Sequence, residues 1–300
     1  NRNKQRFKSA AKHLTRSIRV YKMRDEEAML RTSPARFFKY VTSHLTQRQD
    51  HIVLKKVDGE SVSDSLAICQ ELMAEFTKNF SLPDDSTSVS IAPTCNSAFQ
   101  MELSLEELLK IVSGLSNTAA GPDGIPALVY RRCVGSLARP LLAIFKHSLY
   151  SGTVPAAWKL AKVYPLYKGK GDKSIASSYR PVSLTCVACK ILERLLITHL
   201  NAYLNSNYML DSRQHGFRNG QSTVTNLLSF DKHIVKHLND GKPCDVIMID
   251  FSRAFDKVNH LKLCVKLKRL GIDGCYLKWI VDYLSNRKQY VIYGGALSSM

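Results

Sequence analysis

The stretch VIMIDFSRAFDKVNH, residues 246–260, sets the most specific constraint on the fold. Its apolar run from Val246 to Ile249 predicts a strand at the buried centre of a sheet, and Asp250 ends that run. Because strand ends in layered folds deliver side chains to a cleft, Asp250 is a candidate ligand for Mg²⁺. The alternative interpretation is that Asp250 caps the helix that follows.

Helical and strand patterns alternate on both sides of this stretch and indicate an α+β fold. Strands are predicted over 159–167, 177–184, 244–250 and 288–293, and an Asp-Gly turn predicts a short hairpin over 55–62. Helices are predicted over 63–80, 104–115, 188–204, 222–241, 260–270 and 275–285, and a further helix from about Pro126.

Two of these helices carry specific local signals. The 63–80 helix has an apolar stripe that we expect to face the core, made of Leu66, Cys69, Leu72, Met73 and Phe76. The 104–115 helix begins with Ser104 and Glu107 at the spacing of a capping box, in which each residue caps the other.

The charge of the chain is strongly positive and unevenly distributed. The 300 residues have a net charge of +18, of which residues 1–60 contribute +9, residues 61–120 contribute −6 and residues 121–300 contribute +15. Such a field favours a polyanion as partner, nucleic acid before a membrane surface. The basic segment 1–50 looks helical. It could be an arm that lies along nucleic acid, or a solvent-exposed helix without a specific partner.

The cysteines indicate reduced thiols and not a disulfide framework, since the eight are scattered and several lie in apolar stretches. Cys186 and Cys189 form a CxxC pair, but no second ligand pair stands at a spacing suited to zinc, so we interpret them as packing thiols. No apolar run reaches the roughly 18–20 residues that span a bilayer, and no signal peptide is visible.

Two further segments carry groups suited to phosphates. Cations flank a glycine turn between the first two predicted strands: Lys162, Lys168, Lys170, Lys173 and Arg180. Arg180 there can contact a triphosphate through two parallel hydrogen bonds, or the ribbon is only an exposed charged hairpin. The segment QHGFRNGQST (214–223) puts polar donors and two glycines before a helix, which suits a phosphate backbone or an ordinary connecting loop.

Four segments resemble, in their order and intervals, the reverse transcriptase of non-LTR (LINE-type) retrotransposons of the jockey-like kind. They are AAGPDGIP (119–126), WKLAKVYPLYKGKGDKSIASSYRPVSLTCVACKILERLL (158–196), QHGFRNGQST (214–223) and IDFSRAFDKVNH (249–260). The resemblance covers about residues 100–300. It implies an α+β fold made of the fingers and partial palm of a right-hand polymerase, preceded by a mostly helical, basic N-terminal extension.

The resemblance also implies roles for the matching residues around the nucleotide. Asp250 would be the first catalytic aspartate and a metal ligand, with the carbonyl of Phe251 beside it. Phe255 would be a steric gate that excludes a ribose 2′-hydroxyl and so selects deoxynucleotides. Arg180, with Lys168 as a second candidate, would hold the triphosphate of the incoming dNTP.

Further matching residues would contact the nucleic acid. Gln214, Gly216, Phe217 and Arg218 would lie along the RNA template and the DNA primer. Asp256 stands at the start of the next predicted helix, where a structural role fits better than a catalytic one.

The sequence departs from the family after Phe255. Such enzymes next carry a Gly/Pro/Gln motif and an Ala-Asp-Asp hairpin, whose aspartates complete a site for two Mg²⁺ ions. Neither follows here, and the Asp-Asp pair of this chain, Asp84–Asp85, precedes Asp250. We therefore expect a fragment at both ends that does not polymerise alone, yet binds nucleic acid with strong salt dependence.

Two other functions stay open. One is a non-catalytic RNA- or DNA-binding remnant, and the other is an RNA polymerase or an intron maturase, although Phe255 opposes ribonucleotides. The predicted domains are a basic helical extension over 1–80, a flexible linker over 81–100 and the truncated polymerase part over 101–300. We expect no membrane partner and a location in the nucleus or the cytoplasm.

Overall fold

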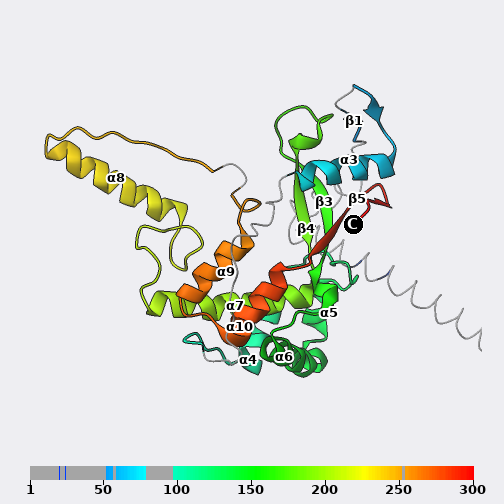
Figure 1. Ribbon diagram of the computed structural model, residues 1–300, viewed down its shortest axis with the longest axis horizontal. Helices are drawn as coiled ribbons and strands as arrows, with labels where there is room; N and C mark the ends of the chain where they lie inside the picture. Colours follow the sequence, from blue (N-terminus) through cyan, green and yellow to red (C-terminus); the bar gives the residue numbers. More distant parts are fainter. Residues whose placement is uncertain (1–19, 21–23, 25–51, 57–58, 79–96, 252–253) are drawn as a thin grey trace, which may run out of the picture. The chain divides into compact units, whose positions relative to one another are not determined.

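The computed structural model describes residues 20, 24, 52–56, 59–78, 97–251 and 254–300 (Figure 1). The chain forms two compact units, residues 1–52 and 53–300, and strands β1 to β6 and helices α3 to α10 belong to the second. The basic segment 1–50, apart from helical Val20 and Arg24, and the linker predicted over 81–100, apart from its last residues, lie outside the described part. The boundaries proposed at residues 80 and 100 therefore stay predictions.

A mixed four-stranded sheet with the order β4-β3-β5-β6 organises the second unit. Its central strand β3 (Leu160–Tyr167) pairs antiparallel with β4 (Tyr179–Leu184) and parallel with β5 (Lys288–Tyr293), which turns into β6 (Ala296–Leu297). Helices and a mixed sheet together confirm the α+β class. The sequence predicted β3, β4 and β5 as strands, but not the parallel pairing that joins β3 to β5.

The predicted short hairpin is also present. β1 (Leu54–Lys55) pairs antiparallel with β2 (Ser61–Val62), and Gly59 between them has a φ of 86°. Glycine suits this turn because a side chain is rarely tolerated at such a φ.

Helix α3 (Ser65–Thr77) packs against β5 (Figure 1). It buries four side chains: Ile68, Cys69, Leu72 and Phe76. The predicted stripe is thus wrong at Leu66, which is 47% exposed, and it omitted Ile68, which is fully buried. With successive residues about 100° apart around a helix, the buried stripe lies roughly a quarter turn from Leu66.

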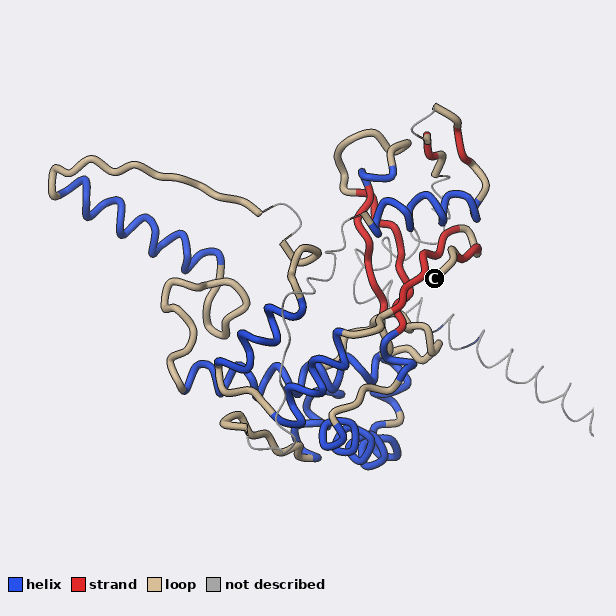
Figure 2. Tube along the Cα trace, viewed as in Figure 1, coloured by secondary structure: helices blue, strands red, loops and turns tan. Residues whose placement is uncertain are grey.

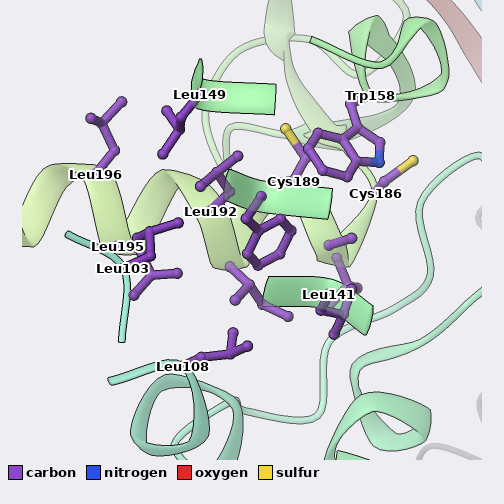
Figure 3. Packing of buried hydrophobic residues seen from close by; sticks show 14 of the residues in the cluster. Leu103, Leu108, Leu141, Leu149, Trp158, Cys186, Cys189, Leu192, Leu195 and Leu196 are labelled. Atoms are coloured by element: carbon purple, nitrogen blue, oxygen red, sulfur yellow. The ribbon is translucent and has the colours of Figure 1, made fainter. Parts of the chain in front are cut away.

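The main core is helical, and side chains from several helices share it. It is built by α4 (Leu105–Ser113), α5 (Ala127–Arg132), α6 (Val134–Ser151), α7 (Val187–Ser206) and α10 (Gly274–Leu284). Figure 3 shows Leu195 of α7 beside Leu103, within a cluster that also holds Leu141 and Trp158. None of the helices in the described residues is long and apolar enough to cross a membrane.

The residues of the capping box predicted at Ser104 also contact another helix. Ser104 Oγ accepts a hydrogen bond from the Glu107 N–H at 3.1 Å, as predicted. The Glu107 carboxylate also contacts His199 Nε2 on α7, at 3.1 Å, and so ties α4 to α7. Burial raises the pKa of Glu107, but hydrogen bonding to His199 and to Ser104 lowers it on balance, so the carboxylate keeps its local partner beside the long-range one.

The two helices on either side of Asp250 differ in burial. Helix α8 (Thr223–Asn239) begins at the predicted cap, Ser222, but buries none of its residues. Helix α9 (His260–Arg269) buries Cys264 and packs against α10.

The strand predicted over 244–250 is not formed. Residues 242–251 are a loop (Figure 2), and the apolar run is exposed: Val246 45%, Ile247 85%, Met248 86% and Ile249 77%. A strand needs a neighbour to accept and donate its backbone hydrogen bonds, and among the described residues no strand pairs with this segment. The prediction of a buried sheet centre at Asp250 is therefore wrong for this structure.

A carboxylate on α10 anchors the start of β3. Asp282 Oδ2 accepts the N–H of Val154 at 2.7 Å, and Oδ1 pairs with Lys159 Nζ at 2.7 Å. Burial raises the pKa of Asp282. The hydrogen bonds from Lys159 and Val154 lower the pKa by more than burial raises it, so the pKa lies below its ordinary value. Lys159 ends the short 3₁₀ turn Ala156–Lys159 that leads directly into β3.

We predict that Asp282→Ala lowers the free energy of unfolding by about 1–3 kcal/mol, because it leaves the N–H of the buried Val154 without its acceptor. Chemical denaturation measures the loss. Asp282→Asn is the control, since an amide oxygen can still accept that bond. Because the pKa in the folded state lies below the ordinary 3.8, the advantage of Asp over Asn should shrink as the pH falls below that value. Equal denaturation midpoints for Asp282→Ala and the unmodified chain would contradict the anchor.

We also predict that the backbone amides of residues 247–251 exchange with solvent in the fastest class, whereas the amide of Val163 in β3 is strongly protected. The first group is exposed and outside any strand, and Val163 is buried between two paired neighbours. Hydrogen exchange followed by mass spectrometry measures both. Protection of 247–251 comparable to that of Val163 would show that this segment is paired after all.

Candidate nucleotide and nucleic-acid interface

One face of the β3–β4 hairpin is open to solvent. Lys162, Tyr164 and Leu166 of β3 stand opposite Leu184, Val182 and Arg180 of β4, and directly opposed residues share a face. On this face Tyr164 is 40% exposed, Leu166 57% and Val182 39%. On the other face Ala161, Val163 and Tyr179 are buried, whereas Pro181 and Ser183 are exposed. Arg180 and Lys162 therefore project from an exposed, partly apolar sheet surface.

Two tyrosines hold the glycine turn of this hairpin. The hydroxyl of Tyr167 donates to the carbonyl of Gly171 at 2.5 Å, and that of Tyr179 donates to the carbonyl of Lys173 at 2.8 Å. Gly171 has a φ of 88°, and a Cβ there would lie 2.9 Å from the Ser178 hydroxyl. The turn is thus a closed, internally bonded ribbon.

The cations of the hairpin differ in the partners that they contact. Lys168 Nζ donates to the carbonyl of Ser177, so it already has a partner within the turn. Asp172, the carboxylate of the turn, accepts the N–H of Ser174 at 2.8 Å, which holds the Asp172 pKa below its ordinary value. Arg180 is exposed and has no ion-pair partner among the described residues. Lys170 is exposed as well, but Arg180 carries the planar guanidinium that can make two parallel hydrogen bonds to an anionic ligand.

The aromatic residues next to Asp250 are exposed as well. Phe251 is 76% exposed and Phe255 is 78% exposed. Phe255 meets Phe217 edge to face, with ring centroids 5.9 Å apart. The structure thus joins the predicted gate residue to one of the predicted nucleic-acid contacts.

The segment 214–223 is a tightly bonded loop. Gln214 Nε2 donates to the carbonyl of Gly216 at 3.2 Å, and Phe217 is 88% exposed with a φ of 59°. Arg218 donates to the carbonyl of Asp211 at 2.8 Å and to Asn205 Oδ1 at 3.2 Å. The Arg218 guanidinium, expected along the nucleic acid, here holds the loop, whereas the Phe217 ring is open to solvent.

The described residues do not fit a two-metal site. Among them, no group of three or more His, Cys, Asp or Glu side chains is close enough to hold one ion. Asp250 has the hard oxygen donors that Mg²⁺ prefers, but a single carboxylate does not make such a site.

Both thiols of the CxxC pair are buried and hydrogen-bonded within the protein. Cys186 Sγ donates to the carbonyl of Ala157 at 3.4 Å, and Cys189 Sγ donates to Glu193 Oε1 at 3.2 Å. Burial raises the pKa of both thiols, which are therefore protonated at neutral pH.

The sequence analysis missed the apolar part of the open hairpin face. Its signal was present as a two-residue alternation, because Lys162, Tyr164 and Leu166 stand at every second position of β3. An exposed face that combines an aromatic ring with two cations can hold both the flat and the charged parts of a nucleotide.

Comparison with known proteins finds one family that matches part of the chain. Residues 168–297 match the family described as reverse transcriptase (RNA-dependent DNA polymerase). This segment contains Arg180, the 214–223 loop and the whole of the opening stretch 246–260.

Several curated relatives come from mobile elements of Drosophila melanogaster. The chain is 36% identical, over 45% of its length, to the probable RNA-directed DNA polymerase from transposon BS. It is 27% identical to the corresponding protein of transposon X-element and 29% identical to the polymerase of the mobile element jockey, over 68% of its length in each case. The matched stretches span 15%, 23% and 23% of those three proteins.

These matches confirm the resemblance drawn from the four motifs. By name, these three relatives are RNA-directed DNA polymerases from mobile elements. Residues 168–297 are thus similar to reverse transcriptases, and the mobile element jockey is among the sources of the similar proteins.

Proposed function

We propose that residues 101–300 supply the fingers and the first part of the palm of an RNA-directed DNA polymerase, and that they bind an RNA template, a DNA primer and a dNTP. The observation that carries the proposal is the open face of the β3–β4 hairpin. It presents Arg180, which no carboxylate of the described residues pairs with, beside Tyr164 and Leu166. The family match over the same segment supports a polymerase in preference to an unrelated anion-binding protein.

Electrostatics favour the triphosphate as the ligand of Arg180. A guanidinium presents its donors in a planar fork that matches phosphate oxygens, and it is always charged. Lys162 lies on the same face, with its Nζ 5.5 Å from the ring centroid of Tyr164. In this proposal the two cations contact phosphate, and Lys168 supports the turn from within.

We propose that Asp250, Phe251 and Phe255 face the same nucleotide from the opposite side. All three are exposed and hence available to a ligand. Asp250 would supply one carboxylate to a divalent ion. Phe255 would stand against the sugar, supported by its edge-to-face contact with Phe217.

We predict that Arg180→Ala weakens dNTP binding by about 1.5–3 kcal/mol, the usual contribution of a hydrogen bond to a charged group. Fluorescence anisotropy with a labelled dNTP and the 300-residue chain measures it. Arg180→Lys should recover part of the loss, because it keeps the charge but not the fork. Arg139→Ala, an exposed arginine on α6, is the matched control. If Arg180→Ala binds as well as the Arg139 control, the hairpin face is not the triphosphate site.

The same assay tests the gate. If the Phe255 ring excludes a 2′-hydroxyl, Phe255→Ala should narrow the preference for a dNTP over the matching rNTP. An unchanged ratio of the two dissociation constants would place the selectivity elsewhere.

A second candidate function is binding of nucleic acid without catalysis. The observation in its favour is that, within the described ranges, Asp250 has no partner carboxylates for a metal site. Both candidates share the nucleic-acid surface and differ in whether a primer is extended.

We predict that the 300-residue chain binds an RNA–DNA hybrid, with affinity falling steeply as salt rises, and does not extend the primer. Anisotropy against salt concentration and a gel-based extension assay measure the two properties. Magnesium-dependent synthesis by this chain would refute its inactivity, and salt-independent binding would argue against phosphate contacts.

A further inference from the structure

Two exposed aromatic residues share an unusual backbone conformation in the loop between α7 and α8. Tyr208 has a φ of 52° and is 93% exposed, and Phe217 has a φ of 59° and is 88% exposed. In the described residues, Asn286 is the one other non-glycine residue with a positive φ. A bulky side chain in this left-handed region is an outlier.

The position of Tyr208 is one that normally belongs to glycine or asparagine. It follows Asn207, which caps the C-terminus of α7, and the chain reverses there with the N–H of Met209 donating to the carbonyl of Leu204 at 2.9 Å. Such a left-handed residue after a helix cap is usually glycine, because a Cβ is strained in that conformation. A tyrosine at this position costs folding stability.

Packing of the Tyr208 ring does not offset this loss of folding stability. With 93% of the residue exposed, the ring buries almost no surface, and no ring contact or side-chain hydrogen bond joins it to another described residue. Strain without a compensating contact in the fold points to a contact outside it.

The loop holds this ring on a stiff platform. Arg218 bridges the loop, donating to Asn205 Oδ1 at 3.2 Å and to the carbonyl of Asp211 at 2.8 Å. Arg213 forms a forked pair with the carboxylate of Asp211, at 2.7 and 3.0 Å. A surface that is ordered before binding loses less entropy when a ligand arrives.

We propose that Tyr208 is a stacking site for an unpaired base of the bound nucleic acid. This inference rests on the proposed function, in which the chain binds nucleic acid, and adds a contact that the family motifs do not include. A flat exposed ring stacks on any base, and the net charge of +15 over residues 121–300 attracts the backbone that carries the base. In a duplex the base faces are covered by their neighbours, so the site takes single-stranded nucleic acid.

The test exploits the opposite effects that the site has on stability and on binding. We expect Tyr208→Gly to raise Tm by about 2–4 °C, because it removes the backbone strain. The same change should weaken binding of a labelled single-stranded oligouridine to the 300-residue chain by about 5- to 150-fold, the range for loss of one stacked base. Binding of a blunt duplex at the same salt concentration should not change.

Two further variants control the experiment. Tyr208→Phe keeps the ring and should bind the single strand as the unmodified chain does. Tyr150→Ala removes an exposed tyrosine on α6, which is 81% exposed, and should leave binding unchanged.

The outcomes separate this inference from the proposed function. If Tyr208→Gly binds the single strand as tightly as the unmodified chain, the stacking site is refuted while the proposed function stands. An equal loss for single strand and duplex also refutes it, because that result indicates a general surface effect. If the unmodified chain binds neither, the proposed function and this inference fail together.

Discussion

The pairing of β3 with neighbours on both of its edges is the interaction on which the rest of the second unit depends. β4 satisfies one edge locally, and β5, from far along the chain, satisfies the other. As a result Val163 and Val291 are completely buried at the centre of the sheet. The hairpin that carries Arg180 is therefore held by strand pairing on both edges of β3. The two partner strands, β4 and β5, lie before and after a long stretch of the chain.

Helix α10 links this sheet to the helical core. Asp282 binds the backbone and the lysine that precede β3, and β5 begins soon after the same helix ends. Trp279, one turn earlier on α10, donates to Ser148 on α6 at 2.9 Å. The orientation of the hairpin face that we propose for the nucleotide is thus set by α10, which lies outside that face.

The same demand for backbone partners explains where the structure departs from a simple strand pattern. The apolar run before Asp250 has no neighbouring strand within the described ranges and stays exposed, and α8, which precedes it, buries nothing. Tyr208 shows a related conflict at a single residue, since its backbone conformation favours glycine while its ring contacts none of the other described residues. Departures from local rules therefore cluster around the surface proposed to meet the nucleic acid.

The sequence by itself determined the elements that depend on neighbours in the chain. The helices at 105–113, 187–206, 223–239 and 260–269, the caps at Ser104 and Ser222, and the β3–β4 hairpin follow from periodicity and turn chemistry, which act over a few residues. The four motifs likewise sufficed for the resemblance to reverse transcriptases, because their order is a property of the sequence. The tertiary structure alone decided the parallel β3–β5 pairing, the Glu107–His199 contact, the exposure of residues 246–251 and the strained Tyr208. Each of these depends on which partner reaches a backbone or side-chain group through space, and no local pattern encodes that.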